Sequence, residues 1–185
     1  MSTDQPVDQK SNPNTMALTA MVIGALVAVG IGAYGAVHPP GQVAINVAGF
    51  SSFLAVKSWL ATLAFVLAIV QVVTALKMYG KIRGNSRTAA FVHRWSGRAA
   101  VIATIPVATH CLYVAGFMAT DARVLLHSFA GAFFYGVFTV KMLMLSTDDA
   151  PGWAIPAAGA TAFATLTVLW ATSSLWFFTT FGVIL

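Results

Sequence analysis

Five long hydrophobic segments, separated by short polar or turn-forming stretches, dominate the pattern along this chain. Each segment reaches or exceeds the ~20 residues that an α-helix needs to cross a hydrocarbon core of ~30 Å. A backbone in lipid must satisfy its own hydrogen bonds, so we expect these segments to be helical. The predicted spans cover about residues 16–37, 53–79, 91–117, 122–145 and 153–181. The expected fold class is an all-α integral membrane protein, a bundle of about five transmembrane helices.

The breaks between the segments carry their own signals. Pro39 and Pro40 cannot continue a helix and therefore end the first span. The mildly apolar connector Gln42–Ser52 is expected either to lie flat on the membrane or to dip into its interface. Residues 1–15 form a polar tail, predicted to be disordered, and residues 16–185 form a single transmembrane domain. The first apolar run is long enough to remain as a span rather than to act as a cleaved signal peptide.

Basic residues predict the orientation of the bundle. Short loops rich in Lys and Arg stay in the cytoplasm, and most basic residues lie near the loop between the second and third spans. These are Lys77, Lys81, Arg83, Arg87, Arg94 and Arg98, with Lys141 expected on the same side. Lys57 and Arg123 fall on the opposite side. We therefore expect the N-terminus inside and the C-terminus outside.

Composition agrees with this interpretation and narrows the function. Hydrophobic residues make up 58% of the chain and charged residues 8%, whereas a soluble domain carries about 25% charged residues. The net charge of +5 comes from basic residues at the membrane borders, so no nucleic-acid partner is expected. Cys111 is the single cysteine, which excludes an internal disulfide and a multi-cysteine cluster. The expected location is the cell (plasma) membrane.

Histidine is the main candidate for chemistry within the spans. No span contains an acidic residue, which argues against a proton-coupled transporter. His110 is expected about 10 Å below the outer boundary of the third span, and His127 about 8 Å below that of the fourth, from the 1.5 Å rise per residue. Two imidazoles at matching depth on consecutive antiparallel helices suit axial ligation of a heme. The sequence thus predicts one bis-histidine heme b, provided that the two rings face each other.

Two neighbours of His127 favour the heme. Gly131, one turn deeper on the same face, lets a flat macrocycle approach the backbone. Arg123, one turn towards the surface, is placed to pair with a heme propionate. The alternative is that each histidine is a hydrogen-bonded helix-packing group. Zinc is disfavoured because His38, interpreted as a loop residue near the outer surface, is the one further ligand nearby.

A second polar cluster is expected at the inner end of the third span. His93 is about 25 Å along the helix from His110, with no other histidine on its side, so a second bis-histidine heme is not expected. Met142 or Met144 remains a candidate partner ligand for His93. One interpretation is a quinone-headgroup site formed by His93, Arg94, Ser96 and Arg98. The other is that Arg94, Trp95 and Arg98 anchor the helix end at the headgroup layer.

The run from His93 to Lys141 resembles the di-histidine membrane cytochromes b, the cytochrome b561 and ferric-reductase-like group. The resemblance rests on His110, on His127 with Ser128-Phe129-Ala130-Gly131, and on the opening His93-Arg94-x-Ser-Gly97. The chain is also similar to an actinobacterial family of b561-like proteins with HRWSGR and HSxAGxxFYGxFxxK patterns. These resemblances imply heme binding. The chain departs from two-heme b561 proteins because it lacks a second histidine pair.

The inner string is also similar to the HRxSG signature of the succinate dehydrogenase cytochrome b subunit, where the motif contributes to a quinone site. Ala90 stands where that family usually has a quinone-contacting serine, and the five-span layout differs, so the match is local.

The sequence leads to a membrane cytochrome b subunit with one heme near the outer face, which transfers electrons between the quinone pool and a redox partner protein or extracytoplasmic acceptor. We expect an electron-transfer subunit of a larger respiratory-type complex rather than a stand-alone enzyme, since no nucleotide or flavin motif is present. The alternative is a non-redox membrane anchor or assembly subunit, whose basic loop contacts anionic lipids. A small-solute transporter is disfavoured by the absence of internal repeats.

Overall fold

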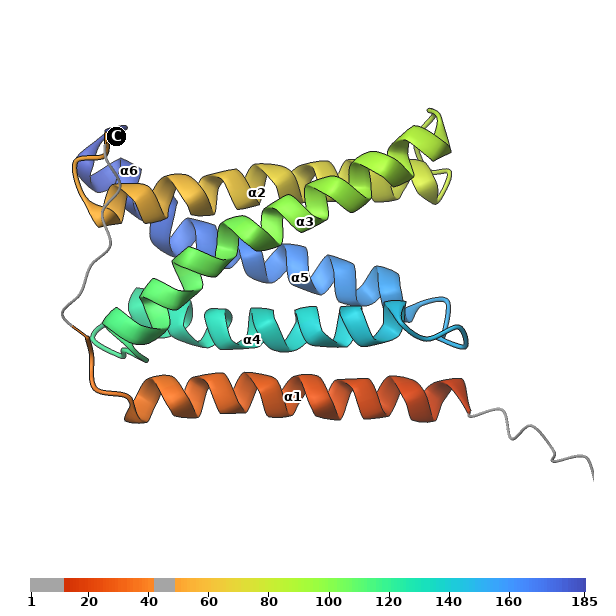
Figure 1. Cartoon of the computed structure of the whole chain (residues 1–185), viewed down its shortest axis with the longest axis horizontal. Coiled ribbons are helices and arrows are strands. Elements are labelled where there is room, and N and C mark those ends of the chain that lie inside the picture. Colours follow the sequence, from red (N-terminus) through yellow and green to blue (C-terminus); the bar gives the residue numbers. More distant parts are fainter. Residues whose placement is uncertain (1–11, 42–48) are drawn as a thin grey trace, which may run out of the picture.

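The structure is a computed structural model that describes residues 12–41 and 49–185, and this part of the chain contains helices and turns but no strand. Five long helices run along the length of the bundle (Figure 1). They are α1 (Pro13–Val37), α2 (Phe53–Met78), α3 (Ser86–His110), α4 (Ala122–Leu145) and α5 (Ala154–Trp170). Two π-helical segments, η1 (Cys111–Ala115) and η2 (Ala171–Leu175), continue α3 and α5, and the short α6 (Trp176–Phe181) follows η2.

The described residues contain five helical stretches that are long and apolar enough to cross a membrane, the number that the hydrophobic pattern predicts. The third consists of α3 continued by η1 and has 30 residues, and the fifth runs from Ala154 to Phe181. Two helices begin earlier than expected: α1 at Pro13, within the predicted tail, and α3 at Ser86 rather than near Phe91. The rest of that tail, residues 1–11, and residues 42–48 of the connector lie outside the described residues.

Polar capping residues explain both early starts. The Asn12 side chain accepts a hydrogen bond from the backbone N of Asn14 at 3.0 Å, and Pro13 takes the first helical position, where its missing N–H costs nothing. The Asn85 side chain accepts from the backbone N of Arg87 at 2.9 Å and so begins α3. A prediction based on hydrophobic runs places the helix start at the first apolar residue and misses such caps.

Small residues allow α1 and α4 to pack closely side by side (Figure 1). A Cβ built on Gly24 would lie 2.6 Å from the carbonyl oxygen of Gly136, so the two backbones meet where neither helix carries a side chain. This is the packing expected between membrane helices, where small residues replace the hydrophobic effect as the source of close contact. α5 packs between α2 and α4, and α3 packs along α2 while crossing the bundle obliquely (Figure 1).

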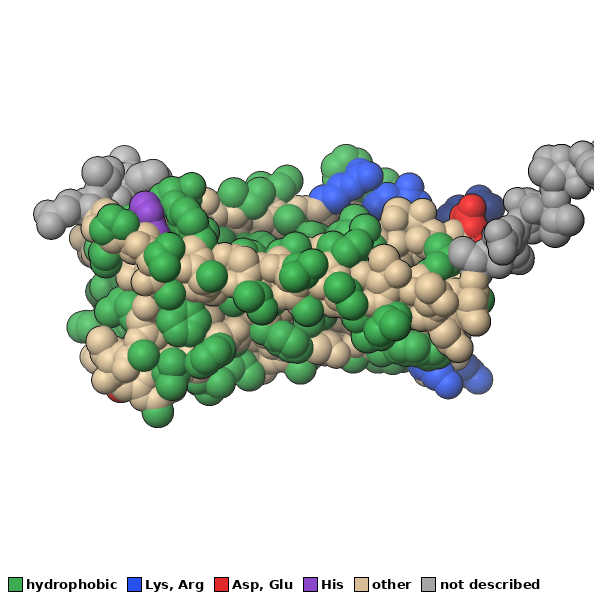
Figure 2. All heavy atoms as spheres, turned by 90° about the horizontal axis from the view of Figure 1, so that it is seen from below, with side chains coloured by type: hydrophobic (Ala, Val, Ile, Leu, Met, Phe, Trp, Pro, Cys, Tyr) green, Lys and Arg blue, Asp and Glu red, His purple; other side chains and the backbone are tan. Residues whose placement is uncertain are grey.

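The two ends of the bundle differ in charge. On the face drawn in Figure 2, Lys and Arg side chains gather at the end that holds the α2–α3 loop, and most of the remaining surface is hydrophobic or neutral. We call this the inner end, because basic loops stay in the cytoplasm, and the end with the α3–α4 connection the outer end. α1 starts at the inner end and the chain finishes at the outer end (Figure 1), as five crossings require. The orientation in the membrane stays a prediction.

Candidate functional site

A cavity of about 560 Å³ occupies the outer half of the bundle. Residues of α1, α2, α3, α4 and α5 line it, together with η1, η2 and Trp176 and Phe177 of α6. Most of its wall is apolar, and the charged side chains in it are Lys57 and Arg123. Its size falls within the range of about 300–1,000 Å³ that is typical of small-molecule and cofactor sites. The cavity therefore has the volume and the apolar wall of a binding site.

Both π-helical segments of the described chain contribute to this wall. Cys111 and Leu112 come from η1, and Thr172 and Ser173 from η2. π-Helical turns are rare and occur frequently at functional sites, because the wider turn changes the direction of the side chains that follow. Gly116, with a φ of 71°, ends η1 in a backbone conformation that favours glycine. The coincidence of two such turns at one cavity marks it as the candidate site.

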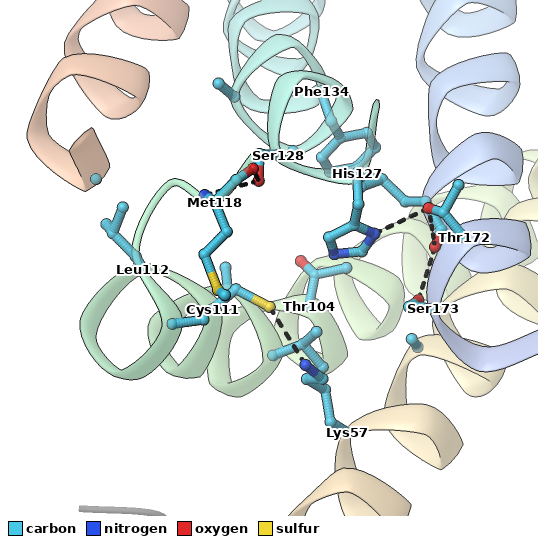
Figure 3. Close-up of a pocket in the computed structure, with 18 of the residues that line it drawn as sticks. Lys57, Thr104, Cys111, Leu112, Met118, His127, Ser128, Phe134, Thr172 and Ser173 are labelled. Atoms are coloured by element: carbon cyan, nitrogen blue, oxygen red, sulfur yellow. Dashed lines mark hydrogen bonds between the residues drawn. The ribbon is translucent and has the colours of Figure 1, made fainter. Parts of the chain in front are cut away.

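His127 has one ring nitrogen fixed by the protein. Its imidazole extends from α4 into the cavity, and its Nδ1 lies 2.9 Å from Thr172 Oγ1 (Figure 3). Thr172 Oγ1 lies 2.7 Å from the carbonyl oxygen of Val168 and has a single hydrogen, which it donates there. With that hydrogen donated to Val168, Thr172 Oγ1 accepts from the Nδ1–H tautomer of His127, and in this tautomer the other ring nitrogen is unprotonated. Nε2 keeps a free lone pair, which is the form of histidine that binds metals or accepts a hydrogen bond.

Arg123 lies one helical turn from His127 and contacts the same π-helical turn. Its Nη1 donates to the carbonyl oxygen of Thr172 at 2.8 Å, and its guanidinium carbon lies 4.0 Å from the centroid of the Trp176 ring. These contacts use one of the five N–H donors of the guanidinium. The rest are available to a carboxylate at the cavity wall, and the propionate role of Arg123 stays a prediction.

Gly131 lies on the cavity wall below His127, as its position one turn deeper on α4 predicts. A Cβ built there would have a single neighbour within 4 Å, Leu169 Cδ2 at the ordinary contact distance of 3.9 Å. The protein itself therefore does not require glycine at this position. The space beside Gly131 belongs to the cavity, which agrees with a ligand that approaches the backbone there.

His110 lies outside the cavity wall. Its ring packs on Phe53 of α2, with 4.5 Å between the ring centroids. The cavity face of α3 and η1 contains Thr104, Ala108 and Cys111, and one residue along an α-helix turns the side chain by about 100°. The structure therefore does not bring His110 and His127 to a common wall, although both lie in the outer half of the bundle. The ligand role of His110 stays a prediction.

Lys57 is a cavity residue that the sequence analysis used for topology alone. It comes from the second turn of α2, is half-buried, and its Nζ lies 3.8 Å from Cys111 Sγ (Figure 3). A lone cation in an otherwise apolar segment is a candidate functional residue by default. The position of Lys57 in the sequence was therefore sufficient to choose it as a candidate site residue. Thr172 carried no such signal.

At the inner end, His93 and Ser96 belong to a hydrogen-bonded contact between α2 and α3. His93 Nδ1 lies 2.9 Å from Thr74 Oγ1, and Gln71 Nε2 donates to Ser96 Oγ at 2.7 Å and to the carbonyl oxygen of His93. Such contacts hold membrane helices together. The other two residues of the predicted inner site, Arg94 and Arg98, are exposed, and Arg98 lies 5.0 Å from the Trp95 ring centroid. The structure thus separates the four residues into an interhelical pair and a surface pair.

Comparison with known proteins gives a family but no relative of known activity. No curated protein and no solved structure matches this chain. A family model described as a family of unknown function (DUF6529) matches residues 16–185, which include all five spanning helices apart from the first three residues of α1. The chain belongs to this family.

Proposed function

We propose that this protein is a membrane cytochrome b that holds one heme in the outer cavity, with His127 as an axial ligand. Electrons would pass between the quinone pool and a partner protein or an extracytoplasmic acceptor. The observation that carries the proposal is the contact of His127 Nδ1 with Thr172 Oγ1, which leaves Nε2 as the ring nitrogen available at the cavity. Histidines that ligate metals almost always donate their other ring N–H to an oxygen in this way.

The rest of the cavity supports a flat, largely apolar and anionic occupant. Its wall is mostly hydrophobic, with open space beside Gly131, and Arg123 retains free donors for a propionate. When bound, the heme would supply the one-electron chemistry, and its potential depends on axial ligands, burial and nearby charge. The protein's own part is to orient His127, exclude water with an apolar wall and place a cation at the outer rim.

His110 is proposed as the second axial ligand, and this role requires a movement. Its imidazole has to leave Phe53 and turn from the α2 side of α3 towards the cavity. An aromatic pair contact of this kind is worth about 0.5–1.5 kcal/mol, so losing this contact by itself lowers heme affinity by up to roughly tenfold. His110 is the last residue of α3 before η1, where the wider π-helical turn eases a change of direction.

The test is a dithionite-reduced minus air-oxidised visible spectrum of the detergent-purified protein, with a pyridine hemochrome assay for stoichiometry. We expect a sharp b-type α-band at about one heme per chain. His127→Ala and His110→Ala should each abolish the bound heme. Full heme in both variants would overturn the assignment. A colourless wild-type protein, after expression with heme supplied, would overturn the cytochrome proposal and favour the non-redox anchor.

A quinone or quinol is proposed as the membrane-soluble redox partner, with its headgroup near the inner end of α3. The exposed Arg94 and Arg98 and the half-buried His93 are the groups there that can contact a headgroup. A quinol analogue added to the oxidised protein in vesicles should reduce the heme, and His93→Phe should slow that reduction without changing heme content. An unchanged rate of heme reduction in His93→Phe would rule out a quinone-headgroup site at His93.

A further inference from the structure

We propose that Lys57 and Arg123 form a two-point clamp for a ligand that carries two carboxylates, and that the cavity selects its occupant by these charges. This inference rests on the proposed function: the two carboxylates would be the heme propionates, and Lys57 would hold the one that Arg123 does not. The juxtaposition is visible only in the folded protein, because the two cations come from α2 and α4.

Lys57 lacks an anionic partner in the part of the chain that the structure describes. Its one polar contact there is Cys111 Sγ at 3.8 Å, a weak acceptor that does not compensate a full charge. An ammonium in an apolar environment is costly unless it pairs with an anion. The Lys57 side chain lines the cavity, so an anion inside the cavity is within its reach.

Arg123 is held in position by contacts that leave its charge uncompensated. The Thr172 carbonyl and the face of Trp176 orient the guanidinium, but neither is a carboxylate. Asp121 is the one side-chain carboxylate of the described residues at the outer end, and its Oδ1 is engaged in capping α4 by accepting from Val124 N at 2.9 Å. Arg123 therefore has no ion pair among these residues and presents a prepared carboxylate site.

The positions of the two cations fit one amphiphilic ligand. His127 lies one turn deeper on α4 than Arg123, and both residues line the same cavity as Lys57. A ligand bound at His127 Nε2 thus has its apolar body among the hydrophobic wall residues and its acidic edge near both cations. A neutral ligand of the same shape would leave two half-buried cations unpaired, and this difference is the source of the selectivity.

The experiment compares heme b with its dimethyl ester, which has the same ring and iron but no carboxylate charge. Heme-free full-length protein in detergent is titrated with each compound, and the Soret band gives two dissociation constants. A charge-assisted hydrogen bond to each carboxylate predicts that wild-type protein binds the diacid at least about tenfold more tightly than the ester. Lys57→Met should reduce this ratio by roughly fivefold or more, chiefly by weakening diacid binding.

Two further variants keep the test decisive. Lys57→Arg retains the charge and should restore most of the wild-type ratio, which a purely structural role of the lysine stem would not predict. Lys141→Met removes another half-buried cation, from the inner part of α4 and away from the cavity wall, and should leave the ratio unchanged.

An equal diacid-to-ester ratio in wild type and Lys57→Met, with heme bound in both, would overturn the clamp and leave the cytochrome proposal intact. Failure of wild type to bind either compound would overturn both.

Discussion

The two ends of this bundle contain the same histidine–threonine arrangement in different surroundings. At the outer end His127 Nδ1 lies 2.9 Å from Thr172 Oγ1, and at the inner end His93 Nδ1 lies 2.9 Å from Thr74 Oγ1. Each threonine hydroxyl donates at 2.7 Å to the carbonyl four residues earlier in its own helix. With each hydroxyl hydrogen donated within its own helix, both threonines accept from the Nδ1–H tautomer of their histidine, which has its lone pair on Nε2.

What differs is the space and the charge around each pair. The outer pair borders a cavity of about 560 Å³ with Lys57 and Arg123 in its wall. The inner pair lies in the contact between α2 and α3, where Gln71 bonds both Ser96 and the backbone of His93. The same local hydrogen bonds thus border an open cavity in one place and lie within a packed helix–helix contact in the other. Histidine at a given depth in a membrane becomes a candidate ligand only when a cavity lies beside its free nitrogen.

The largest expected contrast comes from removing each imidazole. His127→Ala should lose all bound heme, because the proposed iron ligand is gone. His93→Ala should keep about one heme per chain and lose at most a modest amount of stability, since it removes one interhelical hydrogen bond worth about 1 kcal/mol. The pyridine hemochrome assay and a thermal melt measure the two effects. Equal heme loss in both variants would mean that the inner histidine is a ligand as well.

Removing each threonine hydroxyl should give a smaller contrast of the same kind. Thr172→Val leaves His127 in place but removes the acceptor of its Nδ1–H, and loss of such an outer partner typically weakens metal affinity by about 10–100-fold. Thr74→Val should leave heme affinity unchanged and lower the free energy of unfolding by about 1 kcal/mol. Spectral titration of the heme-free proteins gives the affinities. A Thr172→Val protein with wild-type affinity would show that Nδ1 needs no fixed partner.

Glycines beside the two sites sharpen the comparison further. A Cβ at Gly131 has room, with Leu169 Cδ2 at 3.9 Å, whereas a Cβ at Gly97 would lie 3.1 Å from Oε1 of Gln71. Gly131→Ala should therefore fold at least as well as wild type and bind heme roughly fivefold more weakly, as the added methyl fills the ligand's space. Gly97→Ala should keep its heme affinity and melt below Gly131→Ala. Weaker heme binding in Gly97→Ala, together with a lower melting temperature in Gly131→Ala, would place the ligand at the inner end instead.

Different parts of this molecule were predictable for different physical reasons. The five spans follow from hydrophobicity summed over about 20 residues, which local exceptions hardly change. The depth of His110 and His127 follows from a constant rise per residue. The direction in which a side chain points around the helix axis cannot be predicted in this way, because a shift of one residue changes it by about 100°. In the structure Cys111, rather than His110, lies on the cavity wall.

Contacts between distant segments were beyond the sequence as well. Thr172 is 45 residues from His127 and lies in a π-helical turn that no apolar period indicates. Lys57 and Arg123 were correctly paired as charges on one side of the predicted topology, but their common cavity depends on how α2 and α4 pack around α5. The hydrophobic pattern along the chain thus predicts the helices, whereas their packing decides which residues line the same cavity.

The smallest effect expected is a change in heme potential when the outer arginine is removed. Arg123 and Arg98 make a matched pair, since each lies over a tryptophan ring, at 4.0 Å from Trp176 and 5.0 Å from Trp95. A cation near the propionates stabilises the reduced heme, which carries one more negative charge. For a partly exposed charge worth about 0.2–1 kcal/mol, Arg123→Ala should keep its heme and lower the midpoint potential by about 10–40 mV. Arg98→Ala, at the inner end, should leave the potential unchanged in the same redox titration. Equal shifts in both variants would indicate a general effect of protein charge and remove the propionate role of Arg123.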